Sequence, residues 1–477
     1  MKIPFMGGSY EGRSSNVSPE TCINLFYEKG KSGESLVGVA GCTTLVTPAV
    51  GEVRGGIAYN DKAYFMVGNT FYEVNSAGTA TSRGTINTST GRVSMAHNGV
   101  RPSANQQIMI VDGTDGWVYD NTTSTLSQIT DSDFVSSHSV VFIDGYFVFA
   151  QSGGSDRFWI TSQYDGTAID PADFATAEGS PDSIQSLIAD NRELYIFGSE
   201  TLEVWYNSGD TDNTFQRYQG GFKQHGCVAK HSPARFDNSV IWLSRNDRGD
   251  GQITMLSGDN QPSVVSSSEL NYQISTYKNI DQAFGYSYQD EGHEFYVITF
   301  PGNGATWALD ASTKEWHRRG HTIDAIFPNR ERYNCHVFAF GEHLFGDFLS
   351  GAIYKLDGSV GTISGTAIPR QRTTLSISDE ENRRRLISIQ LDMEEGQGDG
   401  NTANDDQYWL SYSKNGGHTF TNPVMKNSGE GGDWAKRVIW RMCGSSRNWI
   451  FRIDTWTPKR PVLKGLIARM YGDPNGQ

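Results

Sequence analysis

The sequence predicts an all-β protein with two folded parts, a β-propeller of about six or seven blades and a β-sandwich-like platform domain. Short segments rich in Val, Ile, Phe and Tyr alternate with turns that contain Gly, Asn or Asp, a pattern typical of β-hairpins. No long stretch shows the 3.6-residue period of an amphipathic helix. The hairpins recur at intervals of roughly 50 residues, close to the length of a four-stranded propeller blade.

Residues 1–50 do not fit the repeat. Turn clusters rich in Gly and Ser separate two short predicted strands, at residues 22–27 and 35–39. We interpret this segment as an N-terminal arm that packs with the C-terminal domain or with a neighbouring subunit.

Residues 51–358 carry the repeats and are predicted to form the propeller. A single hairpin cannot bury its own apolar face, so each copy must stack on the next. Short helical turns are expected at most at residues 183–190 and 266–275. The repeats occupy residues 57–74, 108–120, 140–161, 187–206, 236–255, 285–310 and 336–357.

Residues 359–477 have a different pattern, with longer segments and clustered charges. Strands with alternating apolar and polar residues predict sheets with one buried and one wet face, as in a sandwich. The predicted strands are 386–393, 408–413, 438–442, 449–454 and 462–468. Residues 473–477 are expected to be a frayed tail.

Composition limits the class of protein. The formal net charge of −14 argues against binding through phosphate neutralisation, although an acidic wall would let DNA slide past without sticking. The sequence contains no run of 18 apolar residues, so it predicts no membrane helix. The N-terminus lacks the apolar core of a secretory signal, and the chain is therefore expected to begin in the cytoplasm. The five scattered cysteines predict buried, reduced thiols: Cys22, Cys42, Cys227, Cys335 and Cys443.

No catalytic, cofactor or metal motif emerges, so no site residue is predicted. Gly30-Lys31-Ser32 imitates the end of a phosphate loop, but Leu25 stands where that loop needs a Gly. His317 and His321 have the spacing of a helical metal pair, yet their strand context favours a solvated or interface turn. The acidic segment Asp399–Asp406 lacks the ligand spacing of an EF-hand calcium loop, so we expect a plain exposed loop there.

Two further segments predict structural roles. Residues 411–420 resemble the Asp-box turn of sialidases and related propellers, with Ser413 or Asn415 in place of the capping Asp. Arg383-Arg384-Arg385 follows three acids, Asp379 to Glu381. That order favours a local salt-bridge cluster or a subunit contact over a DNA site.

Both ends of the chain resemble the packaged-DNA stabilisation proteins of short-tailed bacteriophages, also called tail accessory, hub or nozzle proteins. The N-terminal resemblance lies in residues 3–10, 22–28 and 39–45, although Ala40 replaces the usual Pro of the last element. The C-terminal resemblance lies in residues 383–385, 391–398, 411–420, 440–444 and 447–452.

The resemblance implies a structural virion protein, not an enzyme, that forms a homohexameric ring at the end of a phage tail. Such a ring binds the tail adaptor ring above it, retains packaged DNA and conducts it during ejection. It also holds tail fibres, spikes, or a terminal needle or plug. The implied contacts with double-stranded DNA are transient and without sequence recognition, no small-molecule substrate is expected, and assembly takes place in the host cytoplasm.

An alternative interpretation remains open, a glycan-binding or sialidase-like propeller. A sialidase needs an arginine cluster, a Tyr nucleophile and an acid on the central face of the propeller. Four arginines are available for such a cluster: Arg157, Arg192, Arg245 and Arg332.

Overall fold

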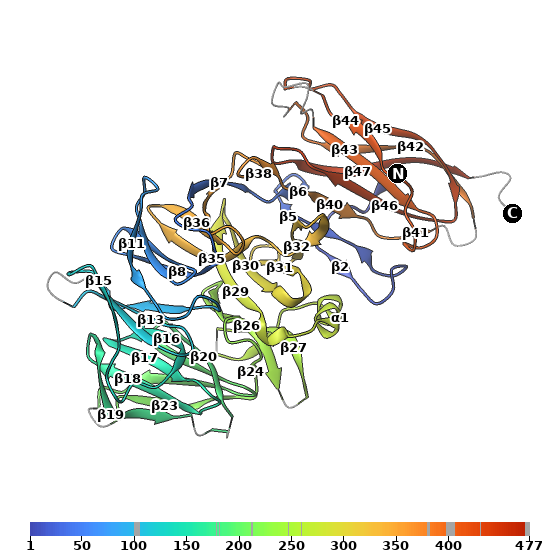
Figure 1. Cartoon of the computed structure of the whole chain (residues 1–477). Coiled ribbons are helices and arrows are strands. Elements are labelled where there is room, and N and C mark those ends of the chain that lie inside the picture. The colour runs from blue at the N-terminus through green and yellow to red at the C-terminus, as the bar shows by residue number, and fades with distance from the viewer. Residues whose placement is uncertain are drawn as a thin grey trace.

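The computed structural model of the protein describes residues 1–472 except 100–104, 178, 181, 211–212, 247, 259, 379–381, 397–405 and 430. Figure 1 shows a ring of sheets built from the middle of the chain and, beside it, a sandwich built mainly from the C-terminal part. Within the described residues the only α-helix is α1 (Ser268–Thr276). The predicted all-β class, with a propeller and a sandwich, is therefore confirmed.

Seven sheets in the described part of the chain are the blades of the propeller, and each of the seven predicted repeats lies within one blade. Strands near the axis of neighbouring blades contact one another, and β35 of the last blade contacts β8 of the first, so the ring is closed. The blades are β8 (Val53–Tyr59), β9 (Lys62–Val67), β10 (Thr70–Val74) and β11 (Ala80–Thr85) in blade one; β12 (Ser94–His97), β13 (Gln107–Val111), β14 (Gly116–Asp120) and β15 (Thr125–Gln128) in blade two; β16 (Ser137–Ile143), β17 (Tyr146–Gln151), β18 (Arg157–Ser162) and β19 (Asp165–Thr176) in blade three; β20 (Ile184–Asp190), β21 (Glu193–Gly198), β22 (Leu202–Asn207) and β23 (Phe215–Lys223) in blade four; β24 (Gly226–Cys227), β25 (Ala234–Phe236), β26 (Ser239–Asn246), β27 (Gly249–Leu256) and β28 (Pro262–Val264) in blade five; β29 (Phe284–Asp290), β30 (His293–Phe300), β31 (Ala305–Asp310) and β32 (Trp316–Arg319) in blade six; and β35 (Tyr333–Ala339), β36 (Glu342–Asp347) and β37 (Ile353–Asp357) in blade seven.

The outer strand of blade seven comes from the other end of the sequence. Strand β7 (Gly41–Val46) pairs antiparallel with β37, with Thr44 opposite Tyr354. It also carries the small hairpin β38 (Thr362–Ile363) and β39 (Thr366–Ala367) on its other side. The segment that the sequence groups with the arm therefore closes the last blade of the ring.

Each space between neighbouring blades holds its own apolar core. Between blades one and two, for example, Tyr64, Met66 and Tyr119 are buried together. Between blades seven and one, Phe65 packs with Leu344. The aromatic strands of the repeat fill these spaces because each blade has two faces to cover, and the surrounding blades supply the cover.

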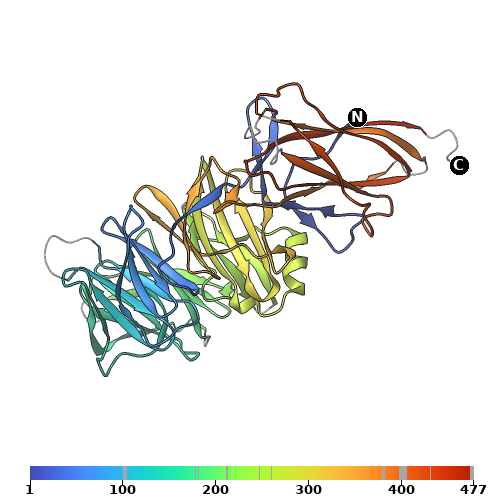
Figure 2. The same ribbon diagram turned by 45° about the horizontal axis from the view of Figure 1, so that its top comes forward.

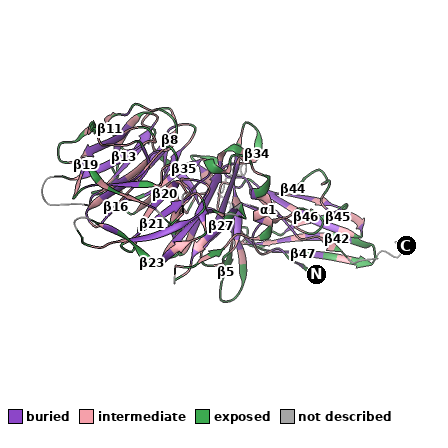
Figure 3. Ribbon diagram, turned by 90° about the horizontal axis from the view of Figure 1, so that it is seen from below, coloured by how far each residue is buried: buried purple, intermediate pink, exposed green. Residues whose placement is uncertain are grey.

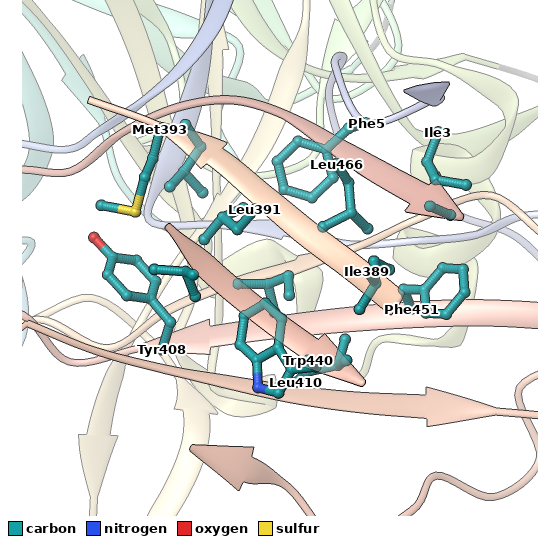
Figure 4. Packing of buried hydrophobic residues seen from close by; sticks show 14 of the residues in the cluster. Ile3, Phe5, Ile389, Leu391, Met393, Tyr408, Leu410, Trp440, Phe451 and Leu466 are labelled. Carbon is teal, nitrogen blue, oxygen red and sulfur yellow. The ribbon is translucent and has the colours of Figure 1, made fainter. Parts of the chain in front are cut away.

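The sandwich consists of two sheets around one core, and residues of the arm contribute to both sheets (Figure 2). Ile3 and Phe5 of the arm pack with Leu391, Trp440 and other residues of that core (Figure 4). The first sheet has the order β45 (Val438–Ser446), β42 (Arg384–Met393), β47 (Val462–Gly472), β6 (Glu34–Gly38), β5 (Leu25–Lys29), with β1 (Lys2–Ile3) on β47. The second has the order β4 (Cys22–Ile23), β40 (Arg370–Thr373), β46 (Asn448–Thr455), β43 (Gln407–Ser413), β44 (Val424–Asn427), with β41 (Ile377–Ser378) on β46.

Strand β4 joins the two bodies into one sheet. It bridges β32 of blade six, where Ile23 faces Arg318, and pairs with β40 of the sandwich on its other edge. The side-chain Nδ2 of Asn24 donates hydrogen bonds of 2.6 Å to the carbonyls of both Gly320 and Pro369. The sheet of blade six therefore continues without a break into the sandwich.

Two local predictions need correction. Residues 184–190 form the strand β20, so the segment 183–190 holds no helical turn. The segment 266–275 holds the nine-residue helix α1, which is longer than the single turn expected, because the hydroxyl of Ser267 accepts a hydrogen bond from the Leu270 amide and caps it. The remaining short elements are β2 (Tyr10–Glu11), β3 (Pro19–Glu20), η1 (Ile280–Gln282), η2 (Pro301–Asn303), β33 (His321–Ile323) and β34 (Ile326–Asn329).

Replacing Gly41 with Ala is expected to lower the free energy of unfolding by about 1–3 kcal/mol, because overpacking a tight site has that cost. A Cβ atom at Gly41 would lie 2.3 Å from the carbonyl oxygen and 2.7 Å from the nitrogen of Thr362, both backbone atoms of the neighbouring strand. The matched control is Gly33→Ala in the nearby hairpin turn, where a Cβ meets nothing within 4 Å. Urea unfolding of both variants measures the effect, and equal midpoints would contradict it.

Candidate functional site

Side chains fill the centre of the propeller at the end where the inner strands begin. Arg92, just before β12, places its guanidinium carbon 4.0 Å from the centre of the Phe284 ring in β29. Its Nη2 donates a hydrogen bond of 2.8 Å to the carbonyl of Asn334 in β35. Because blades two and six are not neighbours, these contacts cross the propeller axis.

A second guanidinium and a carboxylate complete this axial cluster. Arg330 stacks on Phe348 at 4.0 Å and donates a hydrogen bond of 2.6 Å to the side-chain oxygen of Asn334. The amide of Asn334 in turn donates to Glu52 at 2.6 Å. Burial, together with the positive charge of Arg92, lowers the pKa of Arg330 to about 10. The axis is therefore closed by a hydrogen-bonded polar cluster.

One arginine, two tyrosines and an acid meet near the centre of the propeller, in buried positions. Arg319 donates to the hydroxyl of Tyr288, and its Nη1 lies 3.8 Å from Glu331. The Tyr286 hydroxyl donates to Glu331 at 3.3 Å. All four side chains are buried, and burial raises the pKa of Tyr288 to about 12 and that of Tyr286 well above its usual value. Neither phenol is poised to act as a nucleophile at neutral pH.

The four arginines considered for a glycan site occupy separate blades. Arg157 in blade three stacks on Phe174 at 4.8 Å. Arg192 in blade four forms an exposed ion pair with Asp144. The described residues show no contact among the four, which are Arg157, Arg192, Arg245 in β26 and Arg332 beside Asp347. The structure therefore does not bring them together as an arginine cluster.

His317 and His321 lie in strands, so the expectation of a solvated or interface turn is wrong. The ring of His317 in β32 is buried among aromatic rings, 5.7 Å from that of Phe295, and burial lowers its pKa well below the usual range. His321 in β33 is also buried. No group of three metal-ligating side chains occurs within the part of the chain that the structure describes.

The turn after β43 has the hydrogen bonds of an Asp-box-like turn, with Asn415 as the capping residue. Its side-chain oxygen accepts from the Thr419 amide at 3.0 Å, and the Ser413 hydroxyl accepts from the Gly417 amide at 2.9 Å. Ser15 of the arm donates to the Gly416 carbonyl at 3.0 Å. The turn is structural and gives the arm a place to dock.

The remaining candidate segments have simple places in the fold. Gly30 begins the turn between β5 and β6, with its amide bonded to the Gly33 carbonyl. Arg384 and Arg385 begin the exposed end of β42, whereas the acids at 379–381 and the loop 399–405 lie outside the described residues. The five cysteines are buried and free, as predicted.

Sequence patterns did not identify Arg372 in β40, whose guanidinium binds the arm through several hydrogen bonds. Its guanidinium is fully buried and donates to the carbonyls of Phe5, Met6 and Gly8 at 2.7, 3.1 and 2.8 Å. It also forms an ion pair with Glu20 at 3.0 Å. No motif marks it, because four of its acceptors are backbone carbonyls, the fourth being that of Thr21.

Acidification is expected to destabilise the propeller through histidines that burial keeps neutral. Burial lowers the pKa of His138 to about 4 and those of His231 and His336 to about 3. Each side chain binds a proton near pH 6.5 when unfolded but not when folded, so stability is complete above pH 6.5 and falls below it. The expected loss is roughly 1.4 kcal/mol per pH unit for each histidine, until its folded pKa is reached.

The variant His231→Gln should therefore show a shallower loss of stability between pH 6.5 and 4.5. The control is His418→Gln, an exposed position. Urea unfolding at a series of pH values gives the slope, and an unchanged slope for His231→Gln would contradict the assignment.

Charge is divided unevenly between the two parts of the chain. Residues 1–358 contain 24 Lys and Arg against 41 Asp and Glu, whereas residues 359–477 contain 16 against 13. The propeller and arm are therefore strongly acidic, and the sandwich is slightly basic.

Two family models match the sequence and together cover both bodies. A model described as bacteriophage P22 Gp10, beta-propeller, matches residues 1–361, and one described as bacteriophage P22 Gp10, beta-sandwich, matches residues 369–471. A search of curated proteins finds no match. Within the described residues, no helix is long and apolar enough to cross a membrane.

Solved structures with a similar fold include three of low sequence identity. PorZ of the type-IX secretion system of Porphyromonas gingivalis is 10% identical with a TM-score of 0.38, covering 73% of this chain and 44% of its own. The N-terminal domain of Nup159 is 8% identical with a TM-score of 0.41, covering 70% of this chain and 98% of its own. The beta-propeller domain of Myceliophteria thermophila Cps50 (Swd1) is 8% identical with a TM-score of 0.40, covering 66% and 99%. The chain thus spans less than half the length of PorZ.

Proposed function

The chain belongs to the bacteriophage P22 Gp10 family of structural tail proteins, and from this premise we propose that it forms the tail nozzle or hub of a short-tailed phage. In this proposal six copies form a ring below the tail adaptor ring, retain packaged DNA and conduct it during ejection. The ring also holds tail fibres, spikes, or a terminal needle or plug. The protein is a virion component assembled in the host cytoplasm, without a catalytic role, cofactor or small-molecule substrate.

The observation that carries the proposal is the pair of family matches, which cover the propeller and the sandwich in chain order at residues 1–361 and 369–471. A match to one domain alone would support a shared fold, since propellers serve many functions. Both domains in the same order support a shared role as well.

The closed propeller axis supports a channel formed by several copies. Arg92, Phe284 and Arg330 occupy the axis, so a DNA duplex has no path through a single propeller. A ring of copies provides a path between subunits. The formal net charge of −14 favours passage of DNA without lasting attachment.

The alternative of a sialidase-like propeller is weaker, because Tyr286, Glu331 and Arg319 are buried and the other arginines stand apart. Turnover of a fluorogenic glycoside, or binding on a glycan array, would restore that alternative.

Mixing the purified chain with the tail adaptor ring of its phage tests the proposal. Negative-stain images are expected to show a six-fold ring with an open centre stacked on the adaptor. Sedimentation of the chain alone, over a wide range of concentration, gives its own tendency to assemble. A chain that stays monomeric at high concentration and forms no ring on the adaptor would contradict the proposal.

A further inference from the structure

One exposed face of the sandwich combines cationic and apolar side chains. Cross-strand register places Arg441 and Arg469 on either side of Ser388, and Tyr471 beside Arg385. Partners in register, and residues two apart along a strand, share one face of a sheet. The face consists of Lys2 in β1, Arg385 in β42, Arg441 in β45, and Ile467, Arg469 and Tyr471 in β47, and we call it the basic face.

The basic face is open to solvent, and its side chains form no ion pair among the described residues. Ile467 is 41% exposed and Tyr471 is 52% exposed. Arg469 donates to the Tyr471 hydroxyl at 3.0 Å. In the part of the chain that the structure describes, neither Arg441 nor Arg385 forms an ion pair with an acid. Figure 3 shows exposed stretches along the sandwich strands near the C-terminal end of the chain.

Another part of the same outer side of this sheet is covered by the propeller. Toward the propeller, Val37 and Val462 of this sheet pack with Phe295 and Tyr354 of blades six and seven. Asp392 lies on the same outer side of the sheet, opposite Gly465. The outer side of the first sandwich sheet is therefore packed against the propeller in one part and exposed in the other, and the basic face is the exposed part.

Its composition is that of a protein interface. Arg and Tyr are enriched in the buried centre of such interfaces, and acids are depleted there. A surface that grips DNA is more uniformly polar and cationic. A hollow of about 510 Å³ adjoins the face, with Ile467, Tyr471 and Trp449 in its lining, and has room for a large side chain of a partner.

We propose that the basic face binds the acidic propeller part of a second copy of this chain. The inference rests on the proposed ring and names the contact that builds it. Residues 1–358 carry 41 acidic against 24 basic side chains, so each copy offers the charge that complements its neighbour's basic face. Two different surfaces meet in such a contact, and a head-to-tail contact of this kind closes into a ring when the rotation allows it.

The test compares two charge-reversal variants with the same net charge. Arg441→Glu/Arg469→Glu changes the basic face. Lys426→Glu/Lys436→Glu changes two exposed positions elsewhere on the sandwich, in β44 and just before β45. Sedimentation velocity is expected to show that the full-length protein and the control variant self-associate, less so with added salt, whereas the basic-face variant stays monomeric. Circular dichroism and thermal unfolding check that all three are folded.

A mixing experiment tests the head-to-tail geometry. A basic-face variant copy still offers its acidic surface, so it can join one end of a growing assembly but cannot extend it. Adding the variant to the unmodified protein is therefore expected to shorten assemblies in proportion to its share, whereas the control variant is incorporated without effect.

Three results would overturn the proposal. If the basic-face variant forms rings as the unmodified protein does, the face is not the contact, while the proposed ring function stands. If that variant assembles normally but its rings no longer retain duplex DNA, the face binds DNA instead. If the unmodified protein forms no ring even on the adaptor, the proposed function fails as well.

Discussion

Replacing Arg372 with Met is expected to lower the free energy of unfolding by about 3–5 kcal/mol, the usual cost of removing one partner from a buried ion pair. The substitution leaves the Glu20 carboxylate without its partner, and burial already acts to raise the pKa of that carboxyl. It also leaves the carbonyls of Phe5 and Gly8 without their donor. Unpaired buried acceptors are costly because they have lost water as well.

The expected loss is confined to the sandwich and the arm. Urea unfolding followed by tryptophan fluorescence measures it, and limited proteolysis should cut the variant within residues 1–20 first. Arg245→Met is the matched control, since Arg245 is exposed on β26 and its loss should change stability by no more than about 0.5 kcal/mol. Equal stability of the two variants would show that Arg372 does not anchor the arm.

Deleting residues 1–20 is expected to destabilise the sandwich strongly while the propeller stays folded. The deletion removes Ile3 and Phe5, which are 1% and 2% exposed in the sandwich core, and burying such side chains contributes about 1.5–3 kcal/mol each. Strand β7, which closes blade seven, remains in place. Ring assembly should be impaired, because the sandwich is the part that carries the basic face.

Differential scanning calorimetry of the truncated chain should show a strongly lowered sandwich transition beside a propeller transition that is lowered much less. The smaller effect on the propeller is expected because the deletion also removes the ion pair of Glu11 with Arg318 and the hydrogen bond from the Ser9 amide to the Trp316 carbonyl. The full-length variant Ile3→Ala/Phe5→Ala is the control that keeps the backbone acceptors of Arg372. This variant should lose only the stabilisation from burying the two side chains, so its sandwich transition should be lowered less than that of the truncated chain. Normal ring assembly by the truncated chain, or loss of both transitions, would contradict this division of roles.

The blades could be predicted from the sequence because the strands that pair within a blade mostly follow one another directly along the chain. For instance, the sequence predicts adjoining strands at residues 63–67 and 70–74, and in the structure these residues pair as parts of β9 and β10. The closure of blade seven could not be predicted in this way. Strand β7 pairs with β37 at the opposite end of the propeller sequence, and a single sequence holds no local signal for such a pairing.

The residues that hold the site together were harder to predict than the strands. Arg370 and Arg372 alternate along β40, which in a sequence is typical of the wet face of a strand. Both are buried instead, since carbonyls of the arm and of the loops surround them. His317 was misplaced for a related reason, because its cover comes from Phe26 of the distant arm.

The continuity of blade six with the sandwich through β4 opposes movement of the two bodies against each other. Tilting one against the other would break the bridge between Ile23 and Arg318 and the hydrogen bonds of Asn24 to Gly320 and Pro369. For the proposed ring, the width of the bore then depends on an angle fixed within each chain when it folds, not on an adjustable joint. Pressure from the DNA above would be carried from one domain to the other as elastic load on a continuous sheet.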